Sequence, residues 1–174
     1  MIEKFRPTKY YANIFDVDFE KLKEEGIKVV ASDLDNTLVP HDVKLPDERV
    51  KNLIEHVESL GMKFIIVSNN HGRRVREFCL PLGIEYYYNS RKPLPFVFKM
   101  VLKEYKINKD QLVLIGDQLM TDVFGSNSLH IKSIYVDPLA KKDLVYTKLN
   151  RKMEAKVMKD LEKISLFKKG HYYD

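Results

Sequence analysis

Cysteine is nearly absent from this chain of 174 residues, which contains only Cys79. A lone cysteine excludes an internal disulfide framework and a zinc site built from cysteines. Long apolar runs are missing too, since no stretch approaches the roughly 20 residues that span a bilayer, and the first residues show no apolar segment of the secretory type. At 44% apolar and 32% charged residues, the composition is not that of a disordered chain. We expect a globular enzyme or binding domain of the cytoplasm.

The basic excess of the chain is confined to its last part. Lys and Arg together number 30 and Asp and Glu 25, which gives a net charge of +5. Residues 141–174 hold 10 basic and 5 acidic residues and so account for the whole excess, while residues 1–140 are neutral. The length suits a single domain, 1–174. We divide it into a lead-in (1–26), a core and a basic, helical tail (141–174).

Short apolar strands alternate along the core with segments of helical periodicity. This alternation is typical of a parallel sheet that is covered by helices on both faces. We therefore predict an α/β fold with three layers, a Rossmann-like parallel sheet flanked by helices. The expected strands are residues 27–32, 63–67, 84–88, 112–115 and 132–136, and the expected helices are residues 46–60, 73–82, 95–105, 121–127 and 152–167.

Polar residues gather where the predicted strands end. Parallel sheets of this kind bind their ligands outside the carboxyl ends of the strands, so these residues are expected to meet. Taken one at a time, each is more typical of a helix cap, a turn or a solvated surface; the ordered set is what suggests a site. The candidates are Asp33 and Asp35 after the first strand, Ser68 and Asn69 after the second, Lys92 after the third, and Asp117 with Asp122 after the fourth.

The two carboxylates at Asp33 and Asp35 repel each other, and burying them without compensation is costly. A divalent cation removes this cost, and Mg²⁺ prefers oxygen ligands while keeping several waters. Asp117 is the expected third contributor. Asp122 lies near enough to orient a water or a ligand from outside the first shell of the metal.

Phosphate esters are natural substrates for such a site. One Asp can attack phosphorus to form an aspartyl-phosphate, and the other can protonate the leaving oxygen and then deprotonate water. The phosphoryl group also needs a fixed cation and a hydroxyl. Lys92 and Ser68 can supply them, and Arg73 or Arg74 begins a helix from which one side chain could reach the substrate.

These motifs resemble those of the haloacid dehalogenase (HAD) superfamily of phosphotransferases. Residues 33–38 (DLDNTL) match its first motif, residues 67–69 the second, Lys92-Pro93 the third, and residues 116–122 the fourth. The resemblance implies that Asp33 is the nucleophile and Asp35 the general acid and base. It further implies phosphate binding by Ser68, Asn69 and Lys92, and Mg²⁺ bound by Asp33, Asp117 and the backbone carbonyl of Asp35.

The short segments next to the motifs indicate which branch of the superfamily the chain resembles. The segments 39–45 and 88–92 leave no room for the inserted cap domain of many superfamily members. The whole chain is similar to the class IIIA, YqeG-type branch, which resembles phosphatidylglycerophosphatases, so a phospholipid phosphate is the implied substrate. One alternative is a phosphatase for soluble sugar or nucleotide phosphates. Another is a non-catalytic basic adaptor on RNA, the ribosome or a membrane.

The tail suggests an amphipathic helix. Met153, Val157, Leu161 and Ile164 share one face, which we expect to dock on the sheet, and Lys152, Lys156, Lys159 and Lys163 form an adjacent stripe. This stripe is either a solvated edge or a surface for peripheral contact with an anionic membrane. We see no aromatic and basic signature of an RNA-binding module, so nucleic acid is not the expected partner.

Overall fold

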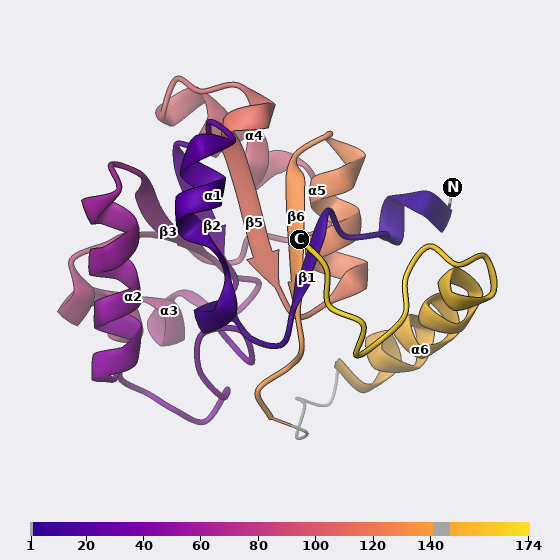
Figure 1. The fold of residues 1–174 in the computed structure, drawn as a ribbon. Helices are drawn as coiled ribbons and strands as arrows, with labels where there is room; N and C mark the ends of the chain where they lie inside the picture. Colours follow the sequence, from indigo (N-terminus) through magenta and orange to yellow (C-terminus); the bar gives the residue numbers. More distant parts are fainter. Residues whose placement is uncertain (1, 141–146) are drawn as a thin grey trace.

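The computed structural model describes residues 2–140 and 147–174, and of residues 147–151 it describes the backbone alone. Six strands form one sheet, all parallel, in the order β1-β6-β5-β2-β3-β4 (Figure 1). The fold class predicted from the sequence is therefore confirmed. The strands are β1 (Lys9–Tyr11), β2 (Val29–Ser32), β3 (Lys63–Val67), β4 (Glu85–Tyr87), β5 (Leu112–Gly116) and β6 (Lys132–Val136).

Helices cover both faces of the sheet, and no cap domain is inserted within the described ranges (Figure 1). One face carries α1, α2 and α3, and the other carries α4. The α-helices are α1 (Phe19–Glu24), α2 (Glu48–Ser59), α3 (Gly72–Cys79), α4 (Phe96–Glu104), α5 (Phe124–Ser128) and α6 (Thr147–Lys163); short turns of other helix types are η1 (Ile2–Phe5), η2 (Ile14–Asp16), η3 (Leu80–Leu82), η4 (Lys109–Gln111) and η5 (Leu119–Val123).

The helix α2 shows how local sequence sets these elements. Its side-chain cap is Asp47, which accepts a hydrogen bond of 3.0 Å from the Val50 amide. The apolar side chains recur at helical spacing and are buried against the sheet. Gly61, with a φ of +78°, follows the last turn in the left-handed region that glycine adopts without strain. The predicted helix 46–60 is thus confirmed to within two residues at each end.

The two central strands position the candidate site. Both β2 and β5 are fully buried, as expected for strands with neighbours on both sides and helices on both faces. Ser32 is in register with Ile115, so the chain leaves both strands at the same level of the sheet. The Asp33 amide continues the pairing by donating to the Ile115 carbonyl (2.8 Å). Asp33 and Asp117 therefore emerge side by side.

The lead-in is part of the sheet, which the sequence patterns did not predict. Its strand β1 pairs with β6 along the outer edge. Tyr10 of β1 also exchanges two backbone hydrogen bonds with Tyr173, so the end of the described chain adds to that edge. The Tyr10 ring is fully buried and packs on Tyr135 and Phe167. Three residues of strand were too few to show a period, whereas these long-range contacts fix them.

The tail is helical, but it docks differently from the prediction. The helix α6 ends at Lys163 rather than near residue 167, and the tail residues 141–146 lie outside the described residues. Leu161 is buried as expected, while Met153 and Ile164 of the predicted inward face are exposed. The reason is Glu154, which is buried and accepts a hydrogen bond from the Leu119 amide. Its contact turns the helix so that a carboxylate faces inward.

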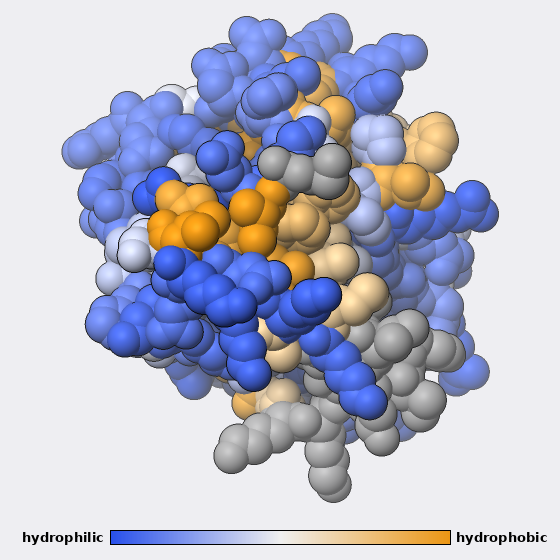
Figure 2. Space-filling model, turned by 90° about the vertical axis from the view of Figure 1, so that its right-hand side faces the viewer, coloured by the Kyte–Doolittle hydropathy of each residue, from blue (hydrophilic) through white to orange (hydrophobic). Residues whose placement is uncertain are grey.

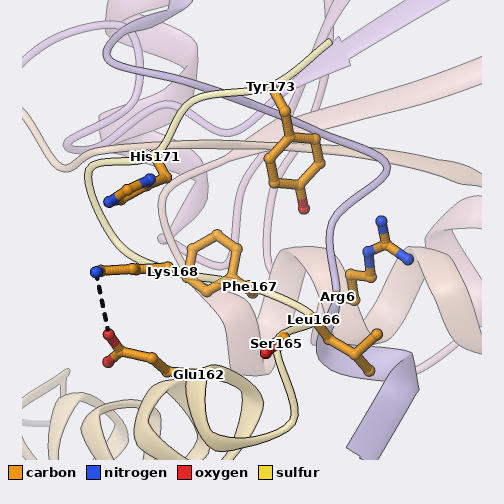
Figure 3. A pocket seen from close by; sticks show the side chains of 8 residues that line it. All are labelled: Arg6, Glu162, Ser165, Leu166, Phe167, Lys168, His171 and Tyr173. Atoms are coloured by element: carbon orange, nitrogen blue, oxygen red, sulfur yellow. Dashed lines mark ion pairs between the residues drawn. The ribbon is translucent and has the colours of Figure 1, made fainter.

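The four lysines of the predicted stripe, residues 152, 156, 159 and 163, are exposed. Figure 2 views the side of the molecule where α6 lies and shows an apolar area framed by hydrophilic side chains. A hollow of about 350 Å³ lies between Arg6 of the lead-in and the segment that follows α6 (Figure 3). The ion pair of Lys168 and Glu162 (3.9 Å) forms part of its wall. Among the described residues, no helix combines the length and apolar character needed to cross a bilayer.

Candidate active site

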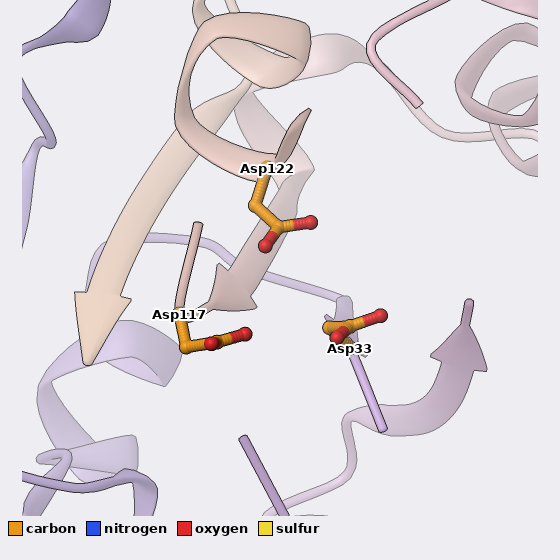
Figure 4. Close-up of side chains that lie close together, drawn as sticks. All are labelled: Asp33, Asp117 and Asp122. Atoms are coloured by element: carbon orange, nitrogen blue, oxygen red, sulfur yellow. The ribbon is translucent and has the colours of Figure 1, made fainter. Parts of the chain in front are cut away.

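Three carboxylates meet at the carboxyl end of the central strands. Asp33 follows β2, Asp117 follows β5, and Asp122 lies in η5, and Figure 4 shows all three directed into a common space. One oxygen of each lies within 4.8 Å of an oxygen of the others. All three residues are buried, with exposed fractions of 7%, 0% and 2%. We call this group the Asp triad.

Lys92 is the cation that bonds to the Asp triad. Its Nζ donates to Asp33 Oδ1 at 2.8 Å and lies 2.7 Å from Asp122 Oδ1. A second hydrogen bond of 2.7 Å goes to the Val67 carbonyl at the end of β3. These two hydrogen bonds and the ion pair with Asp122 fix the ammonium group next to the predicted nucleophile.

The charges of this group shift two pKa values. The pKa of Asp33 is raised to about 7. Burial is the main cause, and together with the charges of Asp122 and Asp35 it outweighs the opposing effect of Lys92. Burial alone lowers the pKa of Lys92, but the carboxylates of Asp122 and Asp33 more than compensate, so its pKa is raised. Lys92 stays charged, while Asp33 carries a charge that its surroundings disfavour.

Close packing holds the other two carboxylates. A Cβ at Gly116 would lie 2.3 Å from the Asp122 carboxyl group, so only glycine allows Asp122 to approach the end of β5 this closely. The Gln118 amide donates to Asp122 Oδ2 (3.1 Å). On the other side, the Thr37 hydroxyl donates to Asp117 Oδ1 (3.2 Å). The sequence predicts Asp122 near the metal, whereas no motif assigns a role to Thr37 or Gly116.

The Asp35 carboxylate lies outside the Asp triad. Arg74 donates to Asp35 Oδ1 from Nε (3.2 Å) and Nη2 (2.9 Å), and Asn70 donates to Asp35 Oδ2 (2.8 Å). Arg74 is in turn anchored on the Lys44 carbonyl (3.3 Å). The side chain predicted to act as acid and base is thus held by two residues from the start of α3 and the loop before it. In the sequence, Arg74 stands out as one of two arginines that begin the predicted helix after residues 67–69, but its contact with Asp35 is not predicted.

Ser68 and Asn69 lie at the end of β3, beside Lys92. The Ser68 hydroxyl is buried and accepts the Asn70 amide (3.1 Å), which leaves its own proton for another acceptor. The Asn69 side chain spends both ends of its amide on the backbone of Lys92, accepting from its N–H (2.7 Å) and donating to its carbonyl (3.0 Å). Ser68 is therefore placed to donate to a ligand, and the Asn69 side chain holds Lys92.

The donor set of the Asp triad fits a divalent cation. It consists of buried carboxylate oxygens close enough to share one ion, which is the ligand type that Mg²⁺ prefers. A cation here would also relieve the repulsion that raises the pKa of Asp33.

The chain is similar to known hydrolases and phosphatases. A family model described as haloacid dehalogenase-like hydrolase matches residues 4–128. A protein of Bacillus subtilis (strain 168) described as probable phosphatase YqeG is 40% identical over 172 residues, which cover 98% of this chain and 97% of that protein. The glyceraldehyde 3-phosphate phosphatase of Pyrococcus abyssi (strain GE5 / Orsay) is 22% identical over 49% of this chain and 40% of its own length.

A solved structure supports the fold alone. The cobalt-bound deoxy-D-mannose-octulosonate 8-phosphate phosphatase of Haemophilus influenzae has a TM-score of 0.54 with this chain, at 17% identity, over 83% of this chain and 95% of its own. Its match to the chain extends well beyond the strands that carry the Asp triad.

Proposed function

The chain belongs to the haloacid dehalogenase-like hydrolase family and is a phosphatase of that family, and from this premise we propose that it is a Mg²⁺-dependent phosphomonoesterase with Asp33 as its nucleophile. The observation that carries the proposal is the Asp triad with Lys92 bonded to two of its members. We propose that Asp33, Asp117 and the backbone carbonyl of Asp35 hold Mg²⁺ and that Asp122 orients Lys92 beside it. When bound, Mg²⁺ lets the anionic nucleophile and phosphate approach each other.

The reaction follows from two carboxylates in different surroundings. In the first step an Asp33 oxygen forms a bond to phosphorus and the ester P–O bond breaks, with Asp35 giving a proton to the leaving oxygen. In the second step a water oxygen attacks the aspartyl-phosphate, Asp35 takes the proton of that water, and the bond between phosphorus and Asp33 breaks. Arg74 and Asn70 keep the Asp35 carboxyl group in place for both proton transfers.

The phosphoryl oxygens are held from the side of β3. In this proposal Ser68 donates its hydroxyl proton and Lys92 its charge to the transferring group, whose negative charge needs fixed donors. Asn69 contributes by holding the backbone of Lys92, as its two hydrogen bonds indicate. A non-catalytic adaptor is not needed to explain the chain, since every residue of the proposed machinery is present and all of them except Asn69 are buried or half-buried.

For the substrate we propose a phospholipid phosphate, with phosphatidylglycerophosphate as the favoured candidate, handled by a cytoplasmic protein at a membrane surface. An uncapped site suits a headgroup that cannot leave its bilayer. The exposed lysines of α6 provide a basic stripe that suits peripheral contact with anionic lipid. The second candidate is a soluble phosphate ester such as a sugar or nucleotide phosphate, which the half-length similarity to a glyceraldehyde 3-phosphate phosphatase favours.

Hydrolysis assays separate these claims. We expect release of phosphate from phosphatidylglycerophosphate in mixed micelles to exceed release from soluble sugar and nucleotide phosphates, to need Mg²⁺, and to stop with chelator. A marked preference for a soluble ester would move the assignment to the second candidate. Full activity in excess chelator would contradict the requirement for Mg²⁺. Full activity of the Asp33→Asn variant would contradict the assignment of Asp33 as the nucleophile.

A further inference from the structure

Exposed apolar side chains surround the candidate active site. Five of the ten large apolar residues that the described part of the chain leaves exposed lie at the carboxyl edge of the sheet, four in loops and Phe96 at the start of α4. Phe96, Leu45 and Tyr88 are 67%, 62% and 53% exposed, and each would gain from leaving water. We define the apolar rim as Leu45, Tyr88, Leu94, Phe96 and Leu139.

The apolar rim brackets the site because its members follow three different strands. Leu45 lies in the loop after β2, and its neighbour Lys44 bonds to the Arg74 that holds Asp35. Leu139 follows β6 and donates its amide to the Asn36 carbonyl, next to Asp35 (3.0 Å). The other three members follow β4, on the opposite side of the two central strands.

A hollow adjoins the part of the apolar rim that follows β4. It measures about 540 Å³ and is lined by Tyr86, Tyr87 and Tyr88 on one side and by Phe96 and Met100 of α4 on the other. Ser90 and Arg91, the two residues before the catalytic Lys92, complete its wall. The hollow therefore extends the apolar surface of the rim around Phe96.

The charge of this region is positive. Residues 88–103 contain no Asp or Glu, and Arg91 and Lys99 are exposed close in sequence to Leu94 and Phe96. Apolar side chains that can enter the headgroup region, together with cations beside them, are the features of proteins that bind the surface of an anionic bilayer. Two copies of this chain would instead bring like charges together at the same face.

We propose that the apolar rim is a membrane-docking surface, which seats the catalytic edge of the protein on a bilayer containing anionic lipid and brings the reacting headgroup to Lys92 and Asp33. The inference rests on the proposed lipid substrate but makes a separate claim about binding. Leu94 and Phe96 enter the bilayer, and Arg91 and Lys99 contact anionic headgroups. The exposed lysines of α6 assist without being the anchor.

The test is sedimentation with vesicles, which needs no turnover. The parent protein, the double variant Leu94→Ser/Phe96→Ser and the control Leu80→Ser are mixed with vesicles of phosphatidylcholine alone or with phosphatidylglycerol. Leu80 is 61% exposed, precedes β4 and belongs neither to the apolar rim nor to the lining of the hollow beside Phe96. We expect the double variant to lose binding to the anionic vesicles by about tenfold, with parent and control equal and both weaker on the neutral vesicles.

Hydrolysis of p-nitrophenyl phosphate, a soluble ester, accompanies each binding measurement. Equal rates for all three proteins, with lipid hydrolysis reduced in the double variant alone, would support the proposal. Unchanged vesicle binding in the double variant would overturn the proposal. So would a parent protein that does not bind vesicles but forms a dimer that the double substitution abolishes. Absence of p-nitrophenyl phosphate hydrolysis in the parent would contradict the proposed function and leave the vesicle result to decide the docking surface.

Discussion

Two lysines of this protein are buried between pairs of carboxylates, and their surroundings differ. Lys9, on the outer strand β1, lies 2.6 Å from both Glu25 and Asp174. Lys132 and Lys21 also bond to these two carboxylates. Lys92, beside the central strands, lies between Asp33 and Asp122 with a third carboxylate within reach.

The pKa directions show what the difference means. Burial raises the pKa of Glu25, but the hydrogen bonds from Lys132 and Lys9 outweigh it, and the pKa is lowered. Hydrogen bonds from Lys21 and Lys9 likewise lower the pKa of Asp174. The pKa of Asp33 is instead raised to about 7. At Lys9 the acids are paired with two lysines each and join the lead-in to the tail. At Lys92 the acids are crowded, which is typical of a functional site.

The largest predicted effect is the loss of hydrolysis when Asp33, the acid beside Lys92, is replaced. Asp33→Asn should lower hydrolysis of p-nitrophenyl phosphate by about 10⁴-fold or more, because the nucleophile is lost. The variant should remain folded by circular dichroism, since it removes a charge that the site disfavours. Asp174→Asn is the matched control from the Lys9 group and should keep the parental rate. A similar loss in both variants would erase the distinction between the two groups.

Tyr10 should matter to stability instead. Its ring is fully buried among Tyr135, Phe167, Tyr172 and Tyr173, so Tyr10→Ala should lower the free energy of unfolding by about 3–5 kcal/mol. Denaturant unfolding measures this loss. At a temperature where the variant is still folded, kcat for p-nitrophenyl phosphate should match the parent. Loss of kcat in fully folded Tyr10→Ala would mean that the outer strand contributes to the site.

Gly116→Ala should damage the site by geometry. The new methyl group would meet the Asp122 carboxyl at 2.3 Å, so Asp122 must move away from Lys92. A displacement of this order costs about 10²-fold in kcat/KM, which the same soluble ester measures. Asp122→Asn tests whether displacement of Asp122 is the cause. If it is, Gly116→Ala/Asp122→Asn should lose no more kcat/KM than the more damaged of the two single variants. Additive losses would point to another effect of the methyl group.

The smallest effect concerns pH. Because the pKa of Asp174 is lowered by folding, its ion pairs stabilise the protein above its unfolded pKa of about 3.9 and are lost as pH falls toward the folded value. The side chain is 34% exposed, so screening limits the contribution to about 1 kcal/mol or less. Urea unfolding at pH 6 and pH 3 should show Asp174→Asn less stable than the parent at pH 6, with a smaller difference at pH 3. An equal difference at both would contradict the ion-pair account.

The same contrast explains what the sequence could predict. The central strands were found from their apolar runs, and the acids and Lys92 from their place after them, because each signal lies within a few residues. The strand β1 was missed, since its three residues depend on Tyr173, more than 160 positions away. The inward turn of Glu154 on α6 was likewise invisible, because its partner is the Leu119 amide on another element.

Within the site, the sequence predicted the residues better than their grouping. Asp122, expected outside the first shell of the metal, shares the space of Asp33 and Asp117, while the Asp35 carboxylate is turned to Arg74 and Asn70. Spacing alone could not decide this, because both outcomes place a carboxylate at the same edge of the sheet. The partners of the Asp35 carboxylate, Asn70 and Arg74, lie 35 and 39 positions away, and no local pattern reports such contacts.

The central claim is that Asp33 and Asp117 of the Asp triad hold one divalent cation, and calorimetric titration with Mg²⁺ tests it most directly. Asp117→Asn removes one ligand, and Asp110→Asn, at an exposed acid of η4, is its control. The account predicts one Mg²⁺ per chain in the parent and in Asp110→Asn, and binding too weak to detect in Asp117→Asn. Binding of equal strength and stoichiometry in Asp117→Asn would contradict it.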